Sequence, residues 1–166
     1  MSITSIIMRE EKKYLRYWPV ATMYGVALLL SFITTKTNLN GHFMSYFMGW
    51  TLILFGLLKL EDPKSFSIGF RRYDLFAENS ELYAKAYPFL EVLLGVLFLF
   101  EIFLMPVTVI TLAVYLSTAL GLLIALHKGE DMYCLCLGTR FQLPLSIIAM
   151  LESLVMIGMA VWMLMM

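Results

Sequence analysis

Two cysteines, Cys134 and Cys136, are the first candidates for chemistry, because they are the only thiols in the chain and one residue separates them. A C-x-C pair can bind a soft metal ion through two thiolates, or it can cycle between dithiol and disulfide. A disulfide between residues this close would form a small, strained ring, and strain makes such a bond easier to reduce. The remaining interpretation is two buried, inert thiols in a loop that packs on the protein.

Other soft ligands lie close to the pair in the sequence. Met132 precedes Cys134 by two residues, and a thioether beside thiolates suits Cu(I) or an ion of similar softness such as Hg(II). His127 is interpreted as an interfacial residue at a helix end rather than as a ligand. We therefore expect any metal to be held by Cys134, Cys136 and Met132.

Methionine is abundant, with 13 residues in the chain. In the last apolar segment, methionines follow one helical face at spacings of three and four, and His42 precedes a second, shorter group. This pattern fits either a path for a soft metal or the filling of irregular gaps between helices, and packing is favoured. The residues are Glu152, Met156, Met159, Met163 and Met166, and, after His42, Met44 and Met48.

Two carboxylates, Glu91 and Glu152, lie within long apolar segments. An ionised carboxylate is costly in hydrocarbon, so such residues face a protein interior or become neutral. We expect both to join the cysteine loop in one polar site that faces the cytoplasm. The alternative is a structural hydrogen bond between helices, for example to Tyr, Ser or Lys59. Glu101 is expected near the outer interface, in contact with solvent.

Composition identifies an integral membrane protein. The chain has 166 residues, of which 61% are hydrophobic and 14% charged, and its mean hydropathy is +0.83. Soluble domains have roughly a quarter charged residues. The formal net charge is zero, which removes any overall electrostatic argument for nucleic acid. Glycine-rich nucleotide loops, metalloprotease motifs and Ser/His/Asp sets are absent from the sequence, so a conventional enzyme is not favoured.

The apolar segments predict an all-α helix bundle with five membrane spans. The second span ends at Lys59, whose long side chain is expected to extend to the interface. Met105-Pro106 is expected to form the hairpin between the third and fourth spans. We divide the chain into an N-terminal segment with one extra transmembrane helix, residues 1–42, and a four-helix core, residues 43–166, with a short amphipathic surface helix at 64–79. The expected spans are 15–35, 43–60, 87–105, 107–126 and 143–166.

The distribution of Lys and Arg predicts the orientation. A cytoplasmic N-terminus places 11 of the 12 basic residues in inside segments and leaves Lys36 alone outside. The C-x-C loop is then cytoplasmic, where thiols stay reduced, and the C-terminus is outside. We expect a bacterial inner membrane protein. The inside residues are Arg9, Lys12, Lys13, Arg16, Lys59, Lys64, Arg71, Arg72, Lys85, Lys128 and Arg140.

Several short motifs resemble the MauE branch of the DoxX-like membrane proteins over about residues 43–166. They are Lys59-Leu60 with Asp62, Pro63 and Phe66, then Tyr73, then Tyr87-Pro88-x-x-Glu91-x-x-x-Gly95, and finally Cys134-x-Cys136-x-Gly138. Members of this family have a four-helix membrane core, so the span at 15–35 is an addition.

The resemblance implies thiol or soft-metal chemistry at Cys134 and Cys136, with Glu91 as a polar residue typical of the family. MauE is implicated in maturing a disulfide-rich dehydrogenase subunit during methylamine utilisation, and other members resemble heavy-metal-handling or glutaredoxin-linked proteins. Maturation outside the cell conflicts with cytoplasmic thiols, unless the role is different or electrons cross the bundle by a relay.

Taken together, these patterns favour soft-metal binding or handling at the C-x-C dithiol, with Cu(I) or Hg(II) as the ion. The first alternative is a thiol–disulfide or maturation factor that uses Cys134 and Cys136 catalytically. The second is an accessory membrane subunit without catalysis. The expected partners are the lipid bilayer and a redox or metal-carrier protein.

Overall fold

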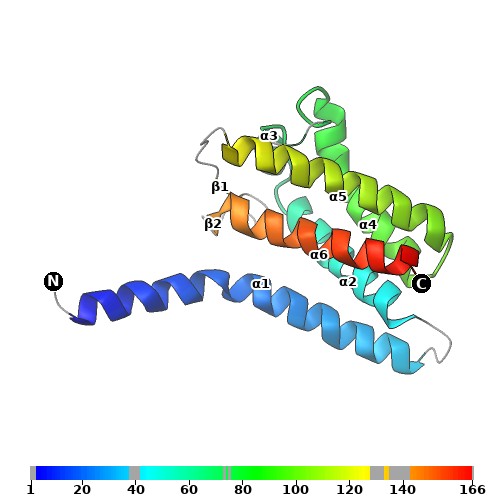
Figure 1. Ribbon diagram of the computed structural model, residues 1–166, viewed down its shortest axis with the longest axis horizontal. Helices are drawn as coiled ribbons and strands as arrows, with labels where there is room; N and C mark the ends of the chain where they lie inside the picture. The colour runs from blue at the N-terminus through cyan, green and yellow to red at the C-terminus, as the bar shows by residue number, and fades with distance from the viewer. Residues whose placement is uncertain are drawn as a thin grey trace.

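The computed structural model of the chain describes residues 3–37, 42–72, 74, 76–127, 133–134 and 143–165. Within them the chain forms five long helices and one short helix (Figure 1). The prediction of an all-helical membrane bundle is confirmed. Two strands of two residues each, β1 and β2, were not predicted. In chain order the elements are α1 Ile3–Thr37, α2 Phe43–Leu60, α3 Pro63–Phe70, α4 Glu81–Leu99, α5 Leu104–His127, β1 Tyr133–Cys134, β2 Leu143–Pro144 and α6 Leu145–Met165.

The long helices are apolar enough to cross a bilayer. Among the described residues, four candidate spans meet both the length and the hydropathy that crossing requires, and α6 adds the shorter apolar stretch Ala149–Met165. Side chains that face outward from the bundle are large and apolar, as lipid contact requires; Leu29, Phe89 and Leu154 are examples. The four spans are Val20–Thr37, Phe43–Glu61, Glu81–Leu99 and Leu104–Ala125.

Helices α2, α4, α5 and α6 enclose a common interior, and α1 packs against α2 from outside (Figure 1). Tyr24 of α1 lies against Phe55 of α2, with ring centroids 5.4 Å apart. Trp50 of α2 donates to the Thr34 hydroxyl of α1 at 3.3 Å. The core therefore has four helices and the N-terminal helix is an addition to it, as predicted.

Helices α2 and α4 approach most closely at two glycines. A Cβ atom placed on Gly49 would lie 2.9 Å from the Gly95 carbonyl oxygen, and one on Gly95 would lie 2.8 Å from the Gly49 oxygen. Only a residue without a side chain fits at such a crossing, as in other closely packed membrane helices.

The bundle has two distinct ends (Figure 1). We call the end that carries α3 and the strands β1 and β2 the loop end. We call the opposite end, with the α4–α5 turn at residues 100–103 and the last residues of α6, the turn end.

The polar connection after α2 contains a shorter helix than predicted. The expected amphipathic helix covers 64–79, whereas α3 ends at Phe70 and is followed by turns. The Asp74 side chain explains why the helix does not continue to residue 79, because its Oδ1 accepts the backbone N–H groups of Phe76 and Ala77 at 3.0 and 2.9 Å. An aspartate that bonds to nearby backbone in this way competes with helix formation.

The predicted third span is displaced. We expect 87–105, but α4 begins at Glu81, where the Ser80 hydroxyl accepts the Tyr83 N–H, and it continues through Pro88 to Leu99. Since α4 starts six residues earlier than expected, Glu91 lies well inside the helix rather than one turn from its start.

The predicted hairpin at Pro106 is also wrong. The turn between α4 and α5 lies at residues 100–103, where Glu101 and Phe103 adopt positive φ angles of 53° and 50°. Pro106 is instead the third residue of α5. Proline is tolerated in the first turn of a helix, because the N–H that it lacks has no partner there.

Candidate functional site

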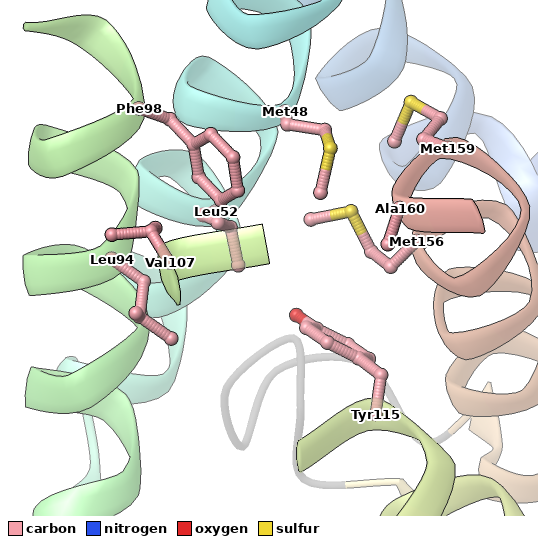
Figure 2. Close-up of a cluster of buried hydrophobic side chains, with 9 residues drawn as sticks. All are labelled: Met48, Leu52, Leu94, Phe98, Val107, Tyr115, Met156, Met159 and Ala160. Atoms are coloured by element: carbon pink, nitrogen blue, oxygen red, sulfur yellow. The ribbon is translucent and has the colours of Figure 1, made fainter. Parts of the chain in front are cut away.

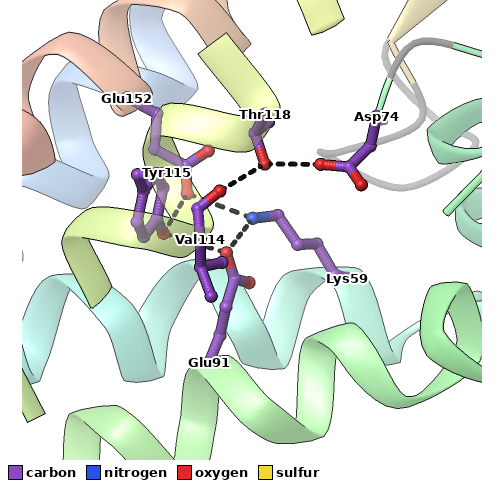
Figure 3. A network of polar contacts seen from close by, with 7 residues as sticks. All are labelled: Lys59, Asp74, Glu91, Val114, Tyr115, Thr118 and Glu152. Atoms are coloured by element: carbon purple, nitrogen blue, oxygen red, sulfur yellow. Dashed lines mark hydrogen bonds and ion pairs between the residues drawn. The ribbon is translucent and has the colours of Figure 1, made fainter. Parts of the chain in front are cut away.

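Four helices each direct one polar side chain to a single point in the bundle interior (Figure 3). Lys59 comes from α2, Glu91 from α4, Tyr115 from α5 and Glu152 from α6. Lys59 Nζ lies 2.6 Å from Glu91 Oε1 and 3.0 Å from Glu152 Oε1. The Tyr115 hydroxyl lies 2.9 and 3.1 Å from the same two oxygens. We call these four residues the charge centre.

The charge centre is withdrawn from solvent and lipid. Lys59, Glu91, Tyr115 and Glu152 each have 3% or less of their surface exposed. Ionisable groups are tolerated at such a position when they are paired and hydrogen-bonded, and here the contacts run between Lys59 Nζ, the Tyr115 hydroxyl and the Oε1 atoms of the two glutamates.

Lys59 points inward rather than toward the interface, which corrects the prediction. It is the penultimate residue of α2, so its long side chain could extend either to the membrane interface or into the bundle interior. Its ammonium lies 5.3 Å from the ring centroid of Tyr87 and 5.8 Å from that of Phe66. These rings and the two carboxylates provide a more favourable environment than lipid for the ammonium.

Glu91 and Glu152 were predicted to share a site, and the structure brings them together. The partners foreseen in the structural alternative, a tyrosine and Lys59, are also present. Sequence reasoning did not identify Tyr115 as a member. It lies in an unbroken apolar helix, and its only signal is a hydroxyl group far from any interface.

Asp74 forms a second buried polar contact, which the sequence analysis missed (Figure 3). Its Oδ2 accepts the hydroxyl groups of Thr118, at 3.0 Å, and Ser117, at 3.4 Å. Asp74 therefore fastens the connection between α3 and α4 to the middle of α5. In the sequence it is one acidic residue among several in a polar segment, without a distinguishing pattern.

A small cavity of about 10 Å³ lies beside the charge centre. A volume of this size accommodates about one water molecule. Its polar wall includes groups of the charge centre as well as Thr118, the partner of Asp74. The lining residues are Lys59, Phe66, Phe70, Tyr87, Tyr115, Thr118, Ala149, Glu152 and Ser153.

The dithiol segment is described only at its start. Cys134 belongs to β1, which pairs antiparallel with β2 so that Cys134 lies opposite Leu143. The side chain of Cys134, and Met132 and Cys136 altogether, lie outside the described residues. The predicted proximity of the thiols to Glu91 and Glu152 therefore stays a prediction. His127 is the last residue of α5 and is exposed, in line with its interpretation as a helix-end residue.

The methionine face of α6 packs in the interior (Figure 2). Met156 and Met159 are buried and lie with Met48 of α2 in one apolar cluster, and Met44 and Met163 pack at its edge. This arrangement agrees with the packing role that the sequence favours. Met166 lies outside the described residues. The cluster consists of Met48, Leu52, Leu94, Phe98, Val107, Tyr115, Met156, Met159 and Ala160.

Two further observations concern the remaining polar groups. Glu101 lies in the α4–α5 turn, about a quarter exposed, and accepts the His42 backbone N–H at 2.8 Å. Glu101 is therefore partly solvated and hydrogen-bonded at the turn end, and its location at the outer interface stays a prediction. Among the residues that the structure describes, no cluster of three or more His, Cys, Asp or Glu side chains has the geometry to hold a metal ion.

Comparison with known proteins assigns the chain to a protein family. No curated protein and no solved structure matches the chain. The family model of methylamine utilisation protein MauE matches residues 37–166. The match confirms the resemblance found in the motifs between Lys59 and Gly138. Because it covers most of the 166 residues, the chain belongs to the MauE family of membrane proteins.

Proposed function

We propose that this membrane protein is a maturation factor that exchanges thiols and disulfides with a partner protein through Cys134 and Cys136. One observation carries the proposal: β1, which contains Cys134, pairs with β2, and β2 runs directly into α6. Cys134 is thus joined to the bundle at the loop end through β1 and β2 and lies outside the described membrane spans. The implication of the family resemblance, disulfide maturation, supports the same role.

The exchange needs no cofactor, because the two electrons that the partner loses are gained by Cys134 and Cys136. In the oxidised protein a thiolate of the partner attacks the Cys134–Cys136 disulfide and forms a mixed disulfide. A second partner thiolate then attacks the partner sulfur of that bond, which leaves the partner oxidised and both cysteines reduced. Strain in the small ring favours this direction. A second disulfide-bearing protein restores the oxidised form by the reverse steps.

Single-cysteine variants test this function. Because the chain has two cysteines, Cys136→Ser or Cys134→Ser leaves one thiol, which cannot resolve a mixed disulfide by itself. We expect a covalent complex with a partner that is seen on non-reducing gels and disappears on reduction. The Cys134→Ser/Cys136→Ser double variant is the control without thiols. Two thiols that resist alkylation and oxidation in intact membranes would contradict the proposal, and a stable complex that tolerates the double variant would favour the accessory-subunit role.

Soft-metal handling is the second candidate, because a groove at the turn end provides suitable ligands. The groove has a volume of about 490 Å³, and its lining includes His42, Met44, Met105 and Met163. Thioether and imidazole groups suit Cu(I). In this hypothesis Cu(I) or Hg(II) is the cargo, bound by Cys134, Cys136 and Met132 at the loop end.

Metal titration separates the two candidates. Purified protein is titrated with Cu(I) beside the Cys134→Ser/Cys136→Ser variant and a Met44→Leu/Met163→Leu variant, which keeps the volume of the groove nearly unchanged. Loss of binding in the cysteine variant supports metal handling by the dithiol. Equal binding by wild type and the cysteine variant would exclude it.

A further inference from the structure

We propose that the charge centre binds one exchangeable proton and that this proton enters and leaves from the loop end of the bundle. The inference is independent of the thiols, because it rests on Lys59, Glu91, Tyr115, Glu152 and the groups that surround them.

The formal charges leave room for one proton. One ammonium and two ionised carboxylates sum to a net charge of −1, in an interior where all of them are buried. An uncompensated charge is very costly in such surroundings, and ionisable groups there usually become neutral. A single proton on the pair of Glu91 and Glu152 makes the charge centre neutral.

The hydrogen bonds in the charge centre also require one bound proton. The Tyr115 hydroxyl contacts Glu91 Oε1 and Glu152 Oε1, yet it carries one hydrogen to donate. A protonated carboxyl supplies the hydrogen for the second contact, with the tyrosine oxygen as acceptor. The geometry therefore suits one neutral and one ionised carboxyl group.

A separate observation concerns the other oxygen of Glu91. Glu91 Oε2 is buried and has no hydrogen-bond partner among the described residues. An ionised carboxylate oxygen without a donor is more costly than the carbonyl oxygen of a neutral carboxylic acid. The bare Oε2 therefore favours a pair that shares a proton over two ionised carboxylates.

The helices around the charge centre add tyrosines as further ionisable groups, and one of them, Tyr83 of α4, interacts electrostatically with Glu91. Tyr87 of α4 lies over Lys59, and Tyr24 of α1 is close enough to interact electrostatically with Glu152 and Lys59. Both are phenols, and α3 contributes the ring of Phe66. Among these described neighbours none adds a cation that would replace the proton.

A polar route leads from the charge centre toward the loop end. The cavity of about 10 Å³ is lined by Lys59, Tyr115, Glu152 and the Thr118 side chain. The Thr118 hydroxyl contacts the Val114 carbonyl of its own helix at 3.1 Å and also Asp74 Oδ2, in the connection between α3 and α4, at 3.0 Å. The cavity is a water-sized gap in the apolar cluster on this side, because Phe66, Phe70 and Tyr87 of that cluster form the rest of its wall. A water-sized space beside hydroxyl and carboxylate groups is what a proton relay requires.

The route toward the turn end is closed by the apolar cluster of Figure 2. Along α6, Met156 and Met159 follow Glu152 by one and two turns, so the cluster begins directly beyond the charge centre. The buried hydroxyl groups on this side donate to backbone carbonyl groups. Thr51, Thr108 and Thr111 donate within their own helices, and Ser45 donates to the Phe98 carbonyl of α4. They offer no chain of contacts that would carry a proton.

Infrared spectroscopy of the full-length protein in lipid vesicles tests the bound proton. Protonated carboxyl groups have a separate C=O absorption that shifts in D₂O. We expect this band in the wild type, its loss in Glu91→Gln and in Glu152→Gln, and an increase in Lys59→Met, which leaves two carboxyls without a cation. Glu101→Gln at the turn end is the matched control and keeps the band.

The wild-type spectrum alone can overturn the proposal, so it does not depend on the folding of a variant. Labelling all glutamates with ¹³C shifts the band if it belongs to glutamate and leaves it unchanged if it belongs to Asp74. Absence of a glutamate band, or a band that persists in both glutamine variants, contradicts a proton on this pair.

The rate at which the band shifts after transfer to D₂O tests the route. Thr118→Val removes the hydroxyl on the proposed route and is expected to slow exchange by roughly tenfold, as the loss of one relay contact raises the barrier. Thr111→Val is the same substitution on the same helix, at a buried hydroxyl on the closed side, and is expected to leave the rate unchanged. Equal rates in Thr118→Val and wild type would exclude the loop-end route.

Discussion

Lys59 Nζ lies 2.6 Å from Glu91 Oε1, although the two residues are 32 positions apart in the chain. This ion pair joins the end of α2 to the middle of α4, the same two helices that meet at Gly49 and Gly95. The α2–α4 pair is therefore fixed by close backbone contact toward one end and by buried charge toward the other.

Removing the Lys59 ammonium is expected to lower the free energy of unfolding more than removing either carboxylate. Lys59→Met leaves Glu91 and Glu152 facing each other, and breaking a buried ion pair by deleting one partner costs about 3–5 kcal/mol. Glu91→Gln keeps the pair of Lys59 and Glu152, so its free energy of unfolding should fall less. Thermal unfolding in detergent, followed by circular dichroism, gives the order. A Lys59→Met protein as stable as Glu91→Gln would contradict it.

The close contact of α2 and α4 can be tested with alanine. Gly95→Ala places a Cβ atom against the Gly49 carbonyl oxygen and forces the helices apart, and overpacking of this kind costs about 1–3 kcal/mol. Gly158→Ala is the control, because a Cβ atom there meets nothing within 4 Å. In the control the higher helix propensity of alanine should stabilise the protein by up to about 1 kcal/mol. Opposite shifts in the unfolding temperature are the expected result.

The sequence predicts the helix bundle well, because the thickness of the bilayer sets the length of each apolar segment and therefore of each helix. It also predicts that Glu91 and Glu152 face the interior, since an ionised carboxylate has few other stable positions in a span. It does not predict the direction of Lys59, because a lysine near the end of a span can reach either the interface or the core. Tyr115 and Asp74 were missed because their partners lie on other helices, which the spacing within one segment does not reveal.

Asp74 is expected to hold the connection between α3 and α4 in place. Asp74→Ala removes an acceptor used by two backbone N–H groups and by the Thr118 hydroxyl, and hydrogen bonds to charged groups contribute about 1.5–3 kcal/mol each. We expect a lower unfolding temperature and faster cleavage in this connection by a protease. Glu78→Ala, at an exposed position in the same connection, is the control and should resemble the wild type. Equal cleavage of both variants would show that Asp74 does not anchor the segment.

The orientation of the bundle is a prediction from its charges, and thiol labelling can test it. The native cysteines are expected to react with a membrane-impermeant maleimide only after the cells are opened, because the loop end is predicted to be cytoplasmic. For the opposite end, Phe103→Cys is introduced in a Cys134→Ser/Cys136→Ser background. Phe103 is 76% exposed in the α4–α5 turn, so this thiol should react in intact cells. The reverse pattern, with native thiols labelled from outside and the Phe103→Cys thiol protected, would invert the topology. It would place the dithiol on the side where a secreted partner acquires its disulfides.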